Sequence, residues 1–477
     1  MNRPRASARD PRPLAPGLPL VGSLAPMLRD PIHFLVDAYR ARGPVFRLEV
    51  MGRRFVVIAG TEANQFMVRH EREHLQNGPI FGGFGAALGG ELFLASADGE
   101  THKRLRRIQT PSYSADHIES RVPEVVASLR RRLGALRPGQ RLDVQRLFQL
   151  LFVEQVGLLL HNHGGLAPLV DDLIRVFRLT LGVEVMRQWP PAALHWPAYT
   201  RSRRRLLAHA RAVVAAHRAH PGRERPDLVD DILSALDRGD VIKDENVALL
   251  TLGPLFGGID TASNTAAFAL YNVLARPAVR ARVMAEVDAI FAAGDAPDWA
   301  AFKDMPALRG VMMETLRMYP VAYLAPRHVA KGFDFGGHRV EAGEQLFVAT
   351  AVPHFLDECF ASPEVFDIDR YAAPRREHVK PGAFAPFGTG VHACAGARFA
   401  QSQLMVTLAT LLRHVELSVD PPGYTLRVKS TPVTMPDGLA VRVDRTRVDG
   451  EVEPWPAFTV DAPADRWSRL ARWASPS

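Results

Sequence analysis

One cysteine lies in a setting that suits metal chemistry. Cys394 belongs to the glycine-rich stretch 387–396, just before a segment that we expect to form a helix from Ala397. A thiol at a helix start faces the positive end of the helix dipole and unpaired amides, which lower its pKa and favour the thiolate. The glycines allow close backbone approach to a flat ligand, on which Phe387 can pack. Such a thiolate can hold iron, and amides that donate to the sulfur tune the iron's potential.

Composition limits the class of protein. The chain has 477 residues, 47% hydrophobic and 23% charged, as expected for a globular protein with a large core. Its two cysteines, Cys359 and Cys394, exclude a disulfide framework and a cysteine cluster for zinc or iron-sulfur. The sequence shows neither the apolar core of a signal peptide nor an apolar run of membrane-spanning length. We therefore expect a cytoplasmic protein without a transmembrane anchor.

A long, largely apolar helix is expected over residues 245–276. Gly257 and Gly258 each weaken it by about 1 kcal/mol relative to alanine, and Asp260 and Thr261 follow directly. An acid beside a hydroxyl can relay protons and donate to a bound oxygen. Taken alone, the same residues also fit a glycine kink in a core helix whose threonine bonds to its own turn.

The other expected elements are mostly helical. We predict helices over 31–42, 278–292, 305–318 and 397–413, a largely helical region over 119–219, and a helix that Thr61 caps. Strands are predicted over 44–50 and 53–59, with short strand-like pieces over 334–350. Residues 78–90 are interpreted as a glycine-rich loop.

Together, these motifs resemble the cytochrome P450 family, and the resemblance covers roughly residues 15–445. The ten residues from Phe387 to Gly396 match the heme-thiolate signature, and the long helix resembles the oxygen-binding segment. The resemblance implies a mainly α fold with small β-sheets, in which heme lies between the long central helix and the cysteine-loop helix. It further implies heme b as cofactor and O2 as co-substrate.

The resemblance also assigns roles to residues. It implies that Cys394 is the axial ligand of the heme iron and that Asp260 and Thr261 deliver protons. Glu314, Arg317 and Arg370 would form a structural network that locks the segment presenting the cysteine. The other residues expected to contact heme, several of them through its propionates, are His102, Arg106, Arg327, Phe387, His392 and Gly396.

Charge suggests where a partner docks. The net charge is +8 and the sequence pI is about 9.7, mostly from arginines spread along the chain. The resemblance implies that Lys103, Arg104, Arg107 and Arg398 form a basic face for a ferredoxin-type or flavodoxin-type electron donor. Trp189 and Trp196, with the arginines after residue 200, allow at most a peripheral membrane contact. We expect no nucleic acid as partner and a monomeric protein.

The expected reaction is hydroxylation, or oxidative demethylation, of a lipophilic small molecule such as a sterol, terpenoid, fatty acid or polyketide. Residues 63–66, 79–82 and 329–332 look similar to the sterol 14-alpha-demethylase branch, which typically has His where this chain has Asp260. Two alternatives stay open. One is a heme-thiolate enzyme that uses or rearranges peroxides, and the other is a non-enzymatic heme sensor.

The domain prediction has three parts. We expect a Pro- and Arg-rich lead-in over 1–20, one P450 domain over 21–447, and a C-terminal extension of unknown role over 448–477. In that extension Trp467, Leu470 and Trp473 share a helical face. His161 and His163 are too few for a metal site and are interpreted as turn residues.

Overall fold

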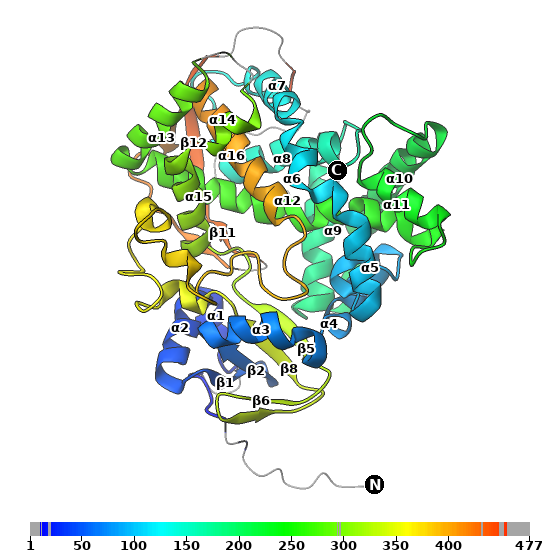
Figure 1. Ribbon diagram of the computed structural model, residues 1–477, viewed down its shortest axis with the longest axis vertical. Helices are drawn as coiled ribbons and strands as arrows, with labels where there is room; N and C mark the ends of the chain where they lie inside the picture. The colour runs from blue at the N-terminus through cyan, green and yellow to red at the C-terminus, as the bar shows by residue number, and fades with distance from the viewer. Residues whose placement is uncertain are drawn as a thin grey trace. The chain divides into compact units, whose positions relative to one another are not determined.

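The computed structural model describes residues 10, 12–17, 21–292, 294, 297–430, 433–447 and 453–455 (Figure 1). The 448–477 extension, with Trp467, Leu470 and Trp473, lies outside the described residues apart from 453–455, and so does most of the 1–20 lead-in. The chain divides into two compact units. The first unit comprises residues up to Ile80, Ala322–Val365 and Arg376–Ala393, and the second comprises the rest. The prediction of one domain over 21–447 remains a prediction.

The first unit is built on a five-stranded sheet of order β1-β2-β8-β5-β3. β1 pairs antiparallel with β2, β2 pairs parallel with β8, and a small hairpin of β6 and β7 stands apart. Its elements are α1 (Leu24–Arg29), α2 (Pro31–Arg42), β1 (Val45–Val50), β2 (Arg53–Ala59), α3 (Thr61–His74), β3 (Leu75–Gln76), β5 (Ala325–Val329), β6 (Phe333–Phe335), β7 (His338–Val340) and β8 (Gln345–Ala349).

Alternation along β1 and β2 divides the core of the first unit in two. Phe46, Leu48 and Val57 belong to one buried cluster, which also contains Leu35 and Val36 of α2. Val56 and Ile58 point the other way, into a second cluster that contains Ala63 and Met67 of α3. Since successive strand residues face opposite sides, the sheet is covered by a helix on each face.

The second unit is mainly helical. α4 (Gly78–Leu88) leads the chain into it, and a three-stranded sheet of order β4-β12-β9 is its largest sheet. The remaining elements are α5 (Gly99–Gln109), α6 (Ala115–Glu119), α7 (Val122–Leu133), β4 (Arg141–Asp143), α8 (Val144–Leu160), α9 (Val170–Thr180), α10 (Pro197–Ala219), α11 (Leu228–Asp237), α12 (Asp244–Leu274), α13 (Pro277–Ile290), α14 (Trp299–Lys303), α15 (Pro306–Met318), α16 (Ala397–His414), β9 (Val415–Asp420), β10 (Val428–Lys429), β11 (Met435–Pro436) and β12 (Ala440–Thr446).

The long helix expected from the sequence is α12. It runs through the middle of the second unit, where α8, α9, α10, α15 and α16 pack around it (Figure 1). Most of its 31 residues are buried, which explains why its sequence is apolar on nearly every side. Within the described part of the chain, no helix has the length and hydropathy needed to cross a bilayer.

Two local predictions were wrong. Residues 78–90 were expected to form a loop, but most of them form α4, because Phe84 and Leu88 are buried on one helical face and this packing outweighs the cost of the glycines. Thr61 was expected to cap α3, but it is the first helical residue. Gly60 takes the cap position at φ +94°, a conformation that glycine adopts without strain.

Candidate active site

Cys394 lies three residues before Ala397, the first residue of α16, and two residues before Gly396, which occupies the N-cap position. Both cysteines are unpaired; Cys359 is buried in the core of the first unit, whereas Cys394 is accessible. Although the residue as a whole is exposed, the surrounding protein atoms desolvate its sulfur and raise its pKa, while the Gly396 amide and the Arg106 guanidinium lower it. The prediction of a lowered pKa was therefore wrong for the thiol on its own, because desolvation outweighs the amide. A bound metal ion deprotonates a coordinating thiol outright.

α5 brings two predicted site residues toward the cysteine loop. Arg106 Nη2 donates to the Cys394 carbonyl oxygen at 3.4 Å, and His102, one turn earlier, is 6% exposed. Tyr113, which the sequence analysis missed, also belongs here: its ring packs edge-on against Phe399 of α16. Burial and the nearby Cys394 raise the pKa of the Tyr113 hydroxyl.

The glycines of α12 leave its surface open. A Cβ atom added to Gly257 or Gly258 would meet no atom within 4 Å. The Thr261 hydroxyl, one turn on, donates to the carbonyl oxygens of Gly257 at 2.8 Å and of Gly258 at 3.3 Å. An uncovered stretch of backbone next to a hydroxyl provides space for a flat or small ligand.

Asp260 points away from solvent. Its side chain is 0% exposed, and Arg178 of α9 pairs with both of its oxygens, with Nε 2.6 Å from Oδ2 and Nη2 2.9 Å from Oδ1. Gln149 of α8 donates to Oδ1 at 2.9 Å. Neither Arg178 nor Gln149 was singled out from the sequence, because each lies about one hundred residues from Asp260 and no local pattern marks them.

Glu314, Arg317 and Arg370 meet in the interior of the second unit. Both Glu314 oxygens accept from Arg317 at 2.8 Å, and Oε1 also accepts from Arg370 Nε at 3.1 Å. Tyr371 Oη donates to Oε2 at 2.6 Å, and the Asp367 amide donates to Oε1 at 3.0 Å. The carboxylate therefore ties α15 to the 3-10 helix Ile368–Tyr371.

In the first unit, Glu71 of α3 joins two predicted site residues. Its Oε1 accepts from Arg327 Nε at 2.7 Å, while Oε2 accepts from the backbone amides of Val391 at 2.6 Å and His392 at 3.3 Å. The sequence analysis missed Glu71, although a signal was present. It follows Ala63 and Met67 at four-residue spacing, so this acid lies on the buried face of its helix.

Three further hydrogen bonds centred on Asn64 hold the start of the cysteine loop within the first unit. Thr389 Oγ1 donates to the Asn64 carbonyl oxygen at 3.2 Å, and the Asn64 amide donates to the carbonyls of Thr350 and Gly382. Phe387 and His392 are both partly exposed. Gly390 has a φ of +81°, and a Cβ there would collide with Glu71, so only glycine fits this turn.

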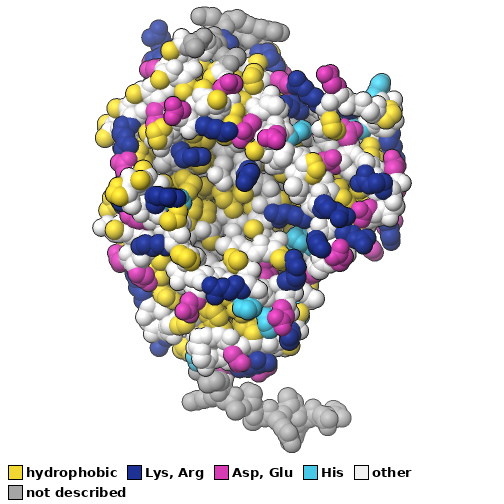
Figure 2. All heavy atoms as spheres, viewed as in Figure 1, with side chains coloured by type: hydrophobic (Ala, Val, Ile, Leu, Met, Phe, Trp, Pro, Cys, Tyr) yellow, Lys and Arg dark blue, Asp and Glu magenta, His cyan; other side chains and the backbone are white. Residues whose placement is uncertain are grey.

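The predicted basic face is partly neutralised. Lys103 and Arg104 lie 3.6 Å and 3.5 Å from Glu100, and Arg104 and Arg107 lie within 4 Å of Asp240. On the face shown in Figure 2, Lys and Arg side chains are interspersed with Asp and Glu.

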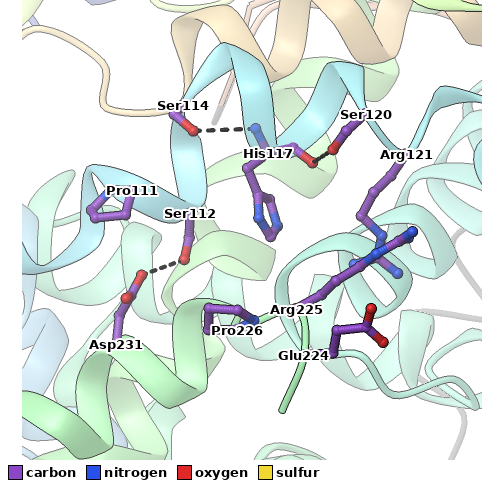
Figure 3. Close-up of a pocket in the computed structure, with 10 residues that line it drawn as sticks. All are labelled: Pro111, Ser112, Ser114, His117, Ser120, Arg121, Glu224, Arg225, Pro226 and Asp231. Atoms are coloured by element: carbon purple, nitrogen blue, oxygen red, sulfur yellow. Dashed lines mark hydrogen bonds between the residues drawn. The ribbon is translucent and has the colours of Figure 1, made fainter. Parts of the chain in front are cut away.

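A surface pocket of about 390 Å³ lies elsewhere in the second unit (Figure 3). Two of its lining side chains are engaged in hydrogen bonds or ion pairs: Ser112 donates to Asp231, which also lines the pocket, at 2.6 Å, and Arg225 pairs at 2.6 Å with Glu124, which does not line it. It contains none of the residues predicted to act in catalysis.

The second unit fits a heme held by a thiolate. It provides an accessible cysteine whose sulfur accepts from an amide, two basic side chains on α5, and the uncovered glycines of α12. Imidazole and guanidinium groups are suitable partners for propionates.

Comparison with known proteins agrees. A family model described as Cytochrome P450 matches residues 11–441. Cyclooctat-9-en-7-ol 5-monooxygenase of Streptomyces melanosporofaciens is 29% identical over 430 residues, which cover 86% of this chain and 90% of the relative. Sterol 14alpha-demethylase of Mycolicibacterium vanbaalenii is 24% identical over 424 residues, which cover 84% and 90%. The crystal structure of the cytochrome P450DA heme domain has a TM-score of 0.79 at 25% identity, with 91% of this chain and 97% of that chain covered.

The match extends over most of the chain, and the mainly α fold with small sheets is the one expected. Members of this family use heme b and O2, draw electrons from redox partners and bind lipophilic substrates. The chain belongs to the cytochrome P450 family of heme-thiolate monooxygenases.

Proposed function

We propose that the protein hydroxylates, or oxidatively demethylates, a lipophilic polycyclic alcohol such as a terpenoid or sterol. One hydroxylation consumes the substrate, O2, two electrons and two protons, and it releases the alcohol and water; removal of a carbon-bound methyl group repeats this oxidation on the same carbon. The observation that carries the proposal is the accessible Cys394 at the start of α16 in a chain that matches the family along its length. Two relatives are named for acting on cyclooctat-9-en-7-ol and on a sterol.

The residues assigned to the heme are those predicted from the sequence. Cys394 would ligate the iron, His102, Arg106, Arg327 and His392 would contact the propionates, and Phe387 and Gly396 would pack near the ring. Heme b, when bound in this way, supplies the activation of O2 and the transfer of one oxygen atom to the substrate. The amide of Gly396, which donates to the sulfur, supports this assignment.

Proton delivery is assigned to Asp260 and Thr261. Thr261 offers a hydroxyl beside the uncovered Gly257. Asp260 is buried and shared by Arg178 and Gln149, so it can pass a proton only after a neighbour releases one of its oxygens. Opening of the Arg178 contact is therefore the movement that this assignment requires.

An aromatic cluster in the second unit supports a lipophilic substrate. Phe84 of α4 lies 5.5 Å from Phe93, 6.1 Å from Phe177 of α9 and 5.9 Å from Phe256 of α12, between ring centroids. Phe256 directly precedes Gly257 in α12. Phe84 and Phe256 are buried, whereas Phe93 and Phe177 are partly exposed, so these last two rings are the ones that can contact an apolar carbon framework.

Electrons would come from a ferredoxin-type or flavodoxin-type donor. The exposed basic residues here are Lys103 and Arg107 of α5 and Arg398 of α16. α16 follows Cys394 in the sequence, and α5 contacts it through Arg106. We also propose that the protein is a monomer and that it acts in the cytoplasm. Its two unpaired cysteines are compatible with a reducing compartment.

The experiment is an absorbance titration of the purified ferric protein with terpenoids, sterols, fatty acids and macrolides. We expect a Soret shift toward high spin with polycyclic alcohols, followed by product formation with NADPH, ferredoxin and reductase. A shift only with fatty acids or macrolides contradicts the proposed substrate class. Turnover with peroxide but not with the donor system would instead support the peroxide-using alternative.

A Cys394→Ala variant tests the iron ligand separately. We expect it to lose the thiolate-type ferrous–CO band and all turnover. A variant that keeps this band would refute the assignment of Cys394. Cys359→Ala is the matched control, because this second cysteine is buried in the first unit and should leave the band unchanged.

A further inference from the structure

The last two turns of α3 carry a second group of potential metal ligands. His70, Glu73 and His74 each offer one ligand atom, and these atoms all lie within 4.8 Å of one another. His70 and His74 are four residues apart and therefore lie on one helical face, and Glu73 lies beside them. All three belong to the first unit, and their chemistry has no part in the function proposed above.

The hydrogen bonding of His74 leaves one ring nitrogen ready to ligate. Its Nδ1 lies 3.0 Å from the Lys331 carbonyl oxygen. A carbonyl can only accept, so Nδ1 carries the proton and the lone pair is on Nε2. A backbone carbonyl that fixes the tautomer and orientation of a histidine is the arrangement found behind most metal-bound histidines.

The two carboxylate oxygens of Glu73 face different neighbours. Oε1 accepts from the Lys331 ammonium, while Oε2 lies 3.7 Å from His74 Nε2. Ligands of a tetrahedral zinc ion with bonds of about 2.0–2.1 Å lie roughly 3.4 Å apart, so this pair needs little adjustment. His70 is exposed, its ring lies 6.3 Å from the His74 ring, and it can turn toward the ion by side-chain rotation alone.

We propose that His70, Glu73 and His74 bind a divalent transition-metal ion of the zinc type. Two imidazoles and one carboxylate form a ligand set suited to Zn²⁺, with a fourth position for water or a donor from another molecule. The Lys331 ammonium competes with the ion for Glu73 and limits the affinity.

The site binds an ion without acting as a metallopeptidase. Residues 70–74 also fit the pattern H-E-x-x-H, in which the glutamate acts as a general base. Here Glu71 is 1% exposed, and its two carboxylate oxygens accept from Arg327 and from the backbone amides of Val391 and His392. Its carboxylate is therefore already engaged and does not serve as a base for a water bound to His70 and His74.

The test is calorimetric titration of the heme-loaded protein with Zn²⁺. We expect one site whose affinity falls about tenfold or more in His70→Ala and in His74→Ala, in line with the loss of one ligand. Lys331→Gln keeps the backbone carbonyl and removes the competing charge, so it should bind zinc more tightly. His338→Ala on β7 is the matched control and should bind as the parent does.

Unchanged affinity in the His70→Ala/His74→Ala double variant would overturn the proposal, as would the lack of any zinc binding by the parent protein. Weaker binding by Lys331→Gln would overturn the assigned role of Glu73. The ferrous–CO spectrum, recorded for each variant, reports folding and heme binding independently. Failure of the zinc site therefore leaves the proposed monooxygenase function untouched.

Discussion

Arg178 holds both carboxylate oxygens of Asp260 inside the second unit, at 2.6 Å and 2.9 Å. The pair joins α9 to α12 one residue before Thr261, whose hydroxyl donates to the turn behind it. The acid and the hydroxyl are therefore neighbours in sequence but engaged with different partners. Asp260 can therefore take up or release a proton only after Arg178 or Gln149 moves away from one of its oxygens.

An Asp260→Asn variant should lower the turnover rate by about 10²-fold or more, because an amide cannot take up and release a proton at this position. A larger solvent deuterium isotope effect should accompany the loss. Asp244→Asn is the control on the same helix, since Asp244 is 73% exposed and pairs with Arg218 at the surface. Turnover within twofold of the parent would show that Asp260 has no part in proton delivery.

Glu314→Gln should destabilise the protein by about 3 kcal/mol or more, since Arg317 and Arg370 would remain buried without their carboxylate. The urea midpoint and the fraction of protein that retains heme are the measurements. Asp369→Asn removes an acid that is 56% exposed and pairs with Arg282, so it should cost less than about 1 kcal/mol. Equal costs for the two variants would contradict the buried network.

Glu71→Gln should also cost about 3 kcal/mol, because Arg327 loses a buried carboxylate while the Val391 amide keeps an acceptor of lower charge. Thermal unfolding measures the loss. Glu73→Gln changes an acid two residues away that is 56% exposed, and we expect a much smaller effect. If both variants unfold like the parent, Glu71 does not secure the start of the cysteine loop.

His161 should make the stability depend on pH. It donates through Nε2 to the Thr251 carbonyl oxygen, and burial lowers its pKa from 6.5 to about 4. Between pH 6.5 and pH 4 the His161 side chain binds a proton in the unfolded chain but not in the folded one. The free energy of unfolding therefore falls as the pH falls. The loss from this residue between pH 7 and pH 5 is about 2 kcal/mol.

A His161→Gln variant should show a correspondingly smaller change in urea midpoint between pH 7 and pH 5. His338→Gln, a partly exposed histidine of β7, should behave like the parent. An identical pH dependence in the parent and His161→Gln would mean that His161 is not held neutral in the fold.

The sequence by itself determined the family, the cysteine and the long helix. These depend on short segments: the loop pattern around Cys394, the spacing of Glu314 and Arg317 on one helix, and the apolar run of α12. Local chemistry and helical periodicity are enough to specify such features, because all of their parts lie within a few turns of one another.

Only the tertiary structure determined which charged and polar groups from distant segments of the chain pair with one another. Arg178 and Gln149 lie 82 and 111 residues from Asp260, and Glu71 lies 256 residues from Arg327. The helical conformation of α4 also depends on the tertiary structure. Its glycines predict a loop from sequence, but in the fold Phe84 packs against the rings of Phe177 and Phe256. The physical reason is burial. A buried charge is costly unless it is paired, and a buried apolar ring must pack against other apolar groups, so the partners depend on which segments the fold brings together.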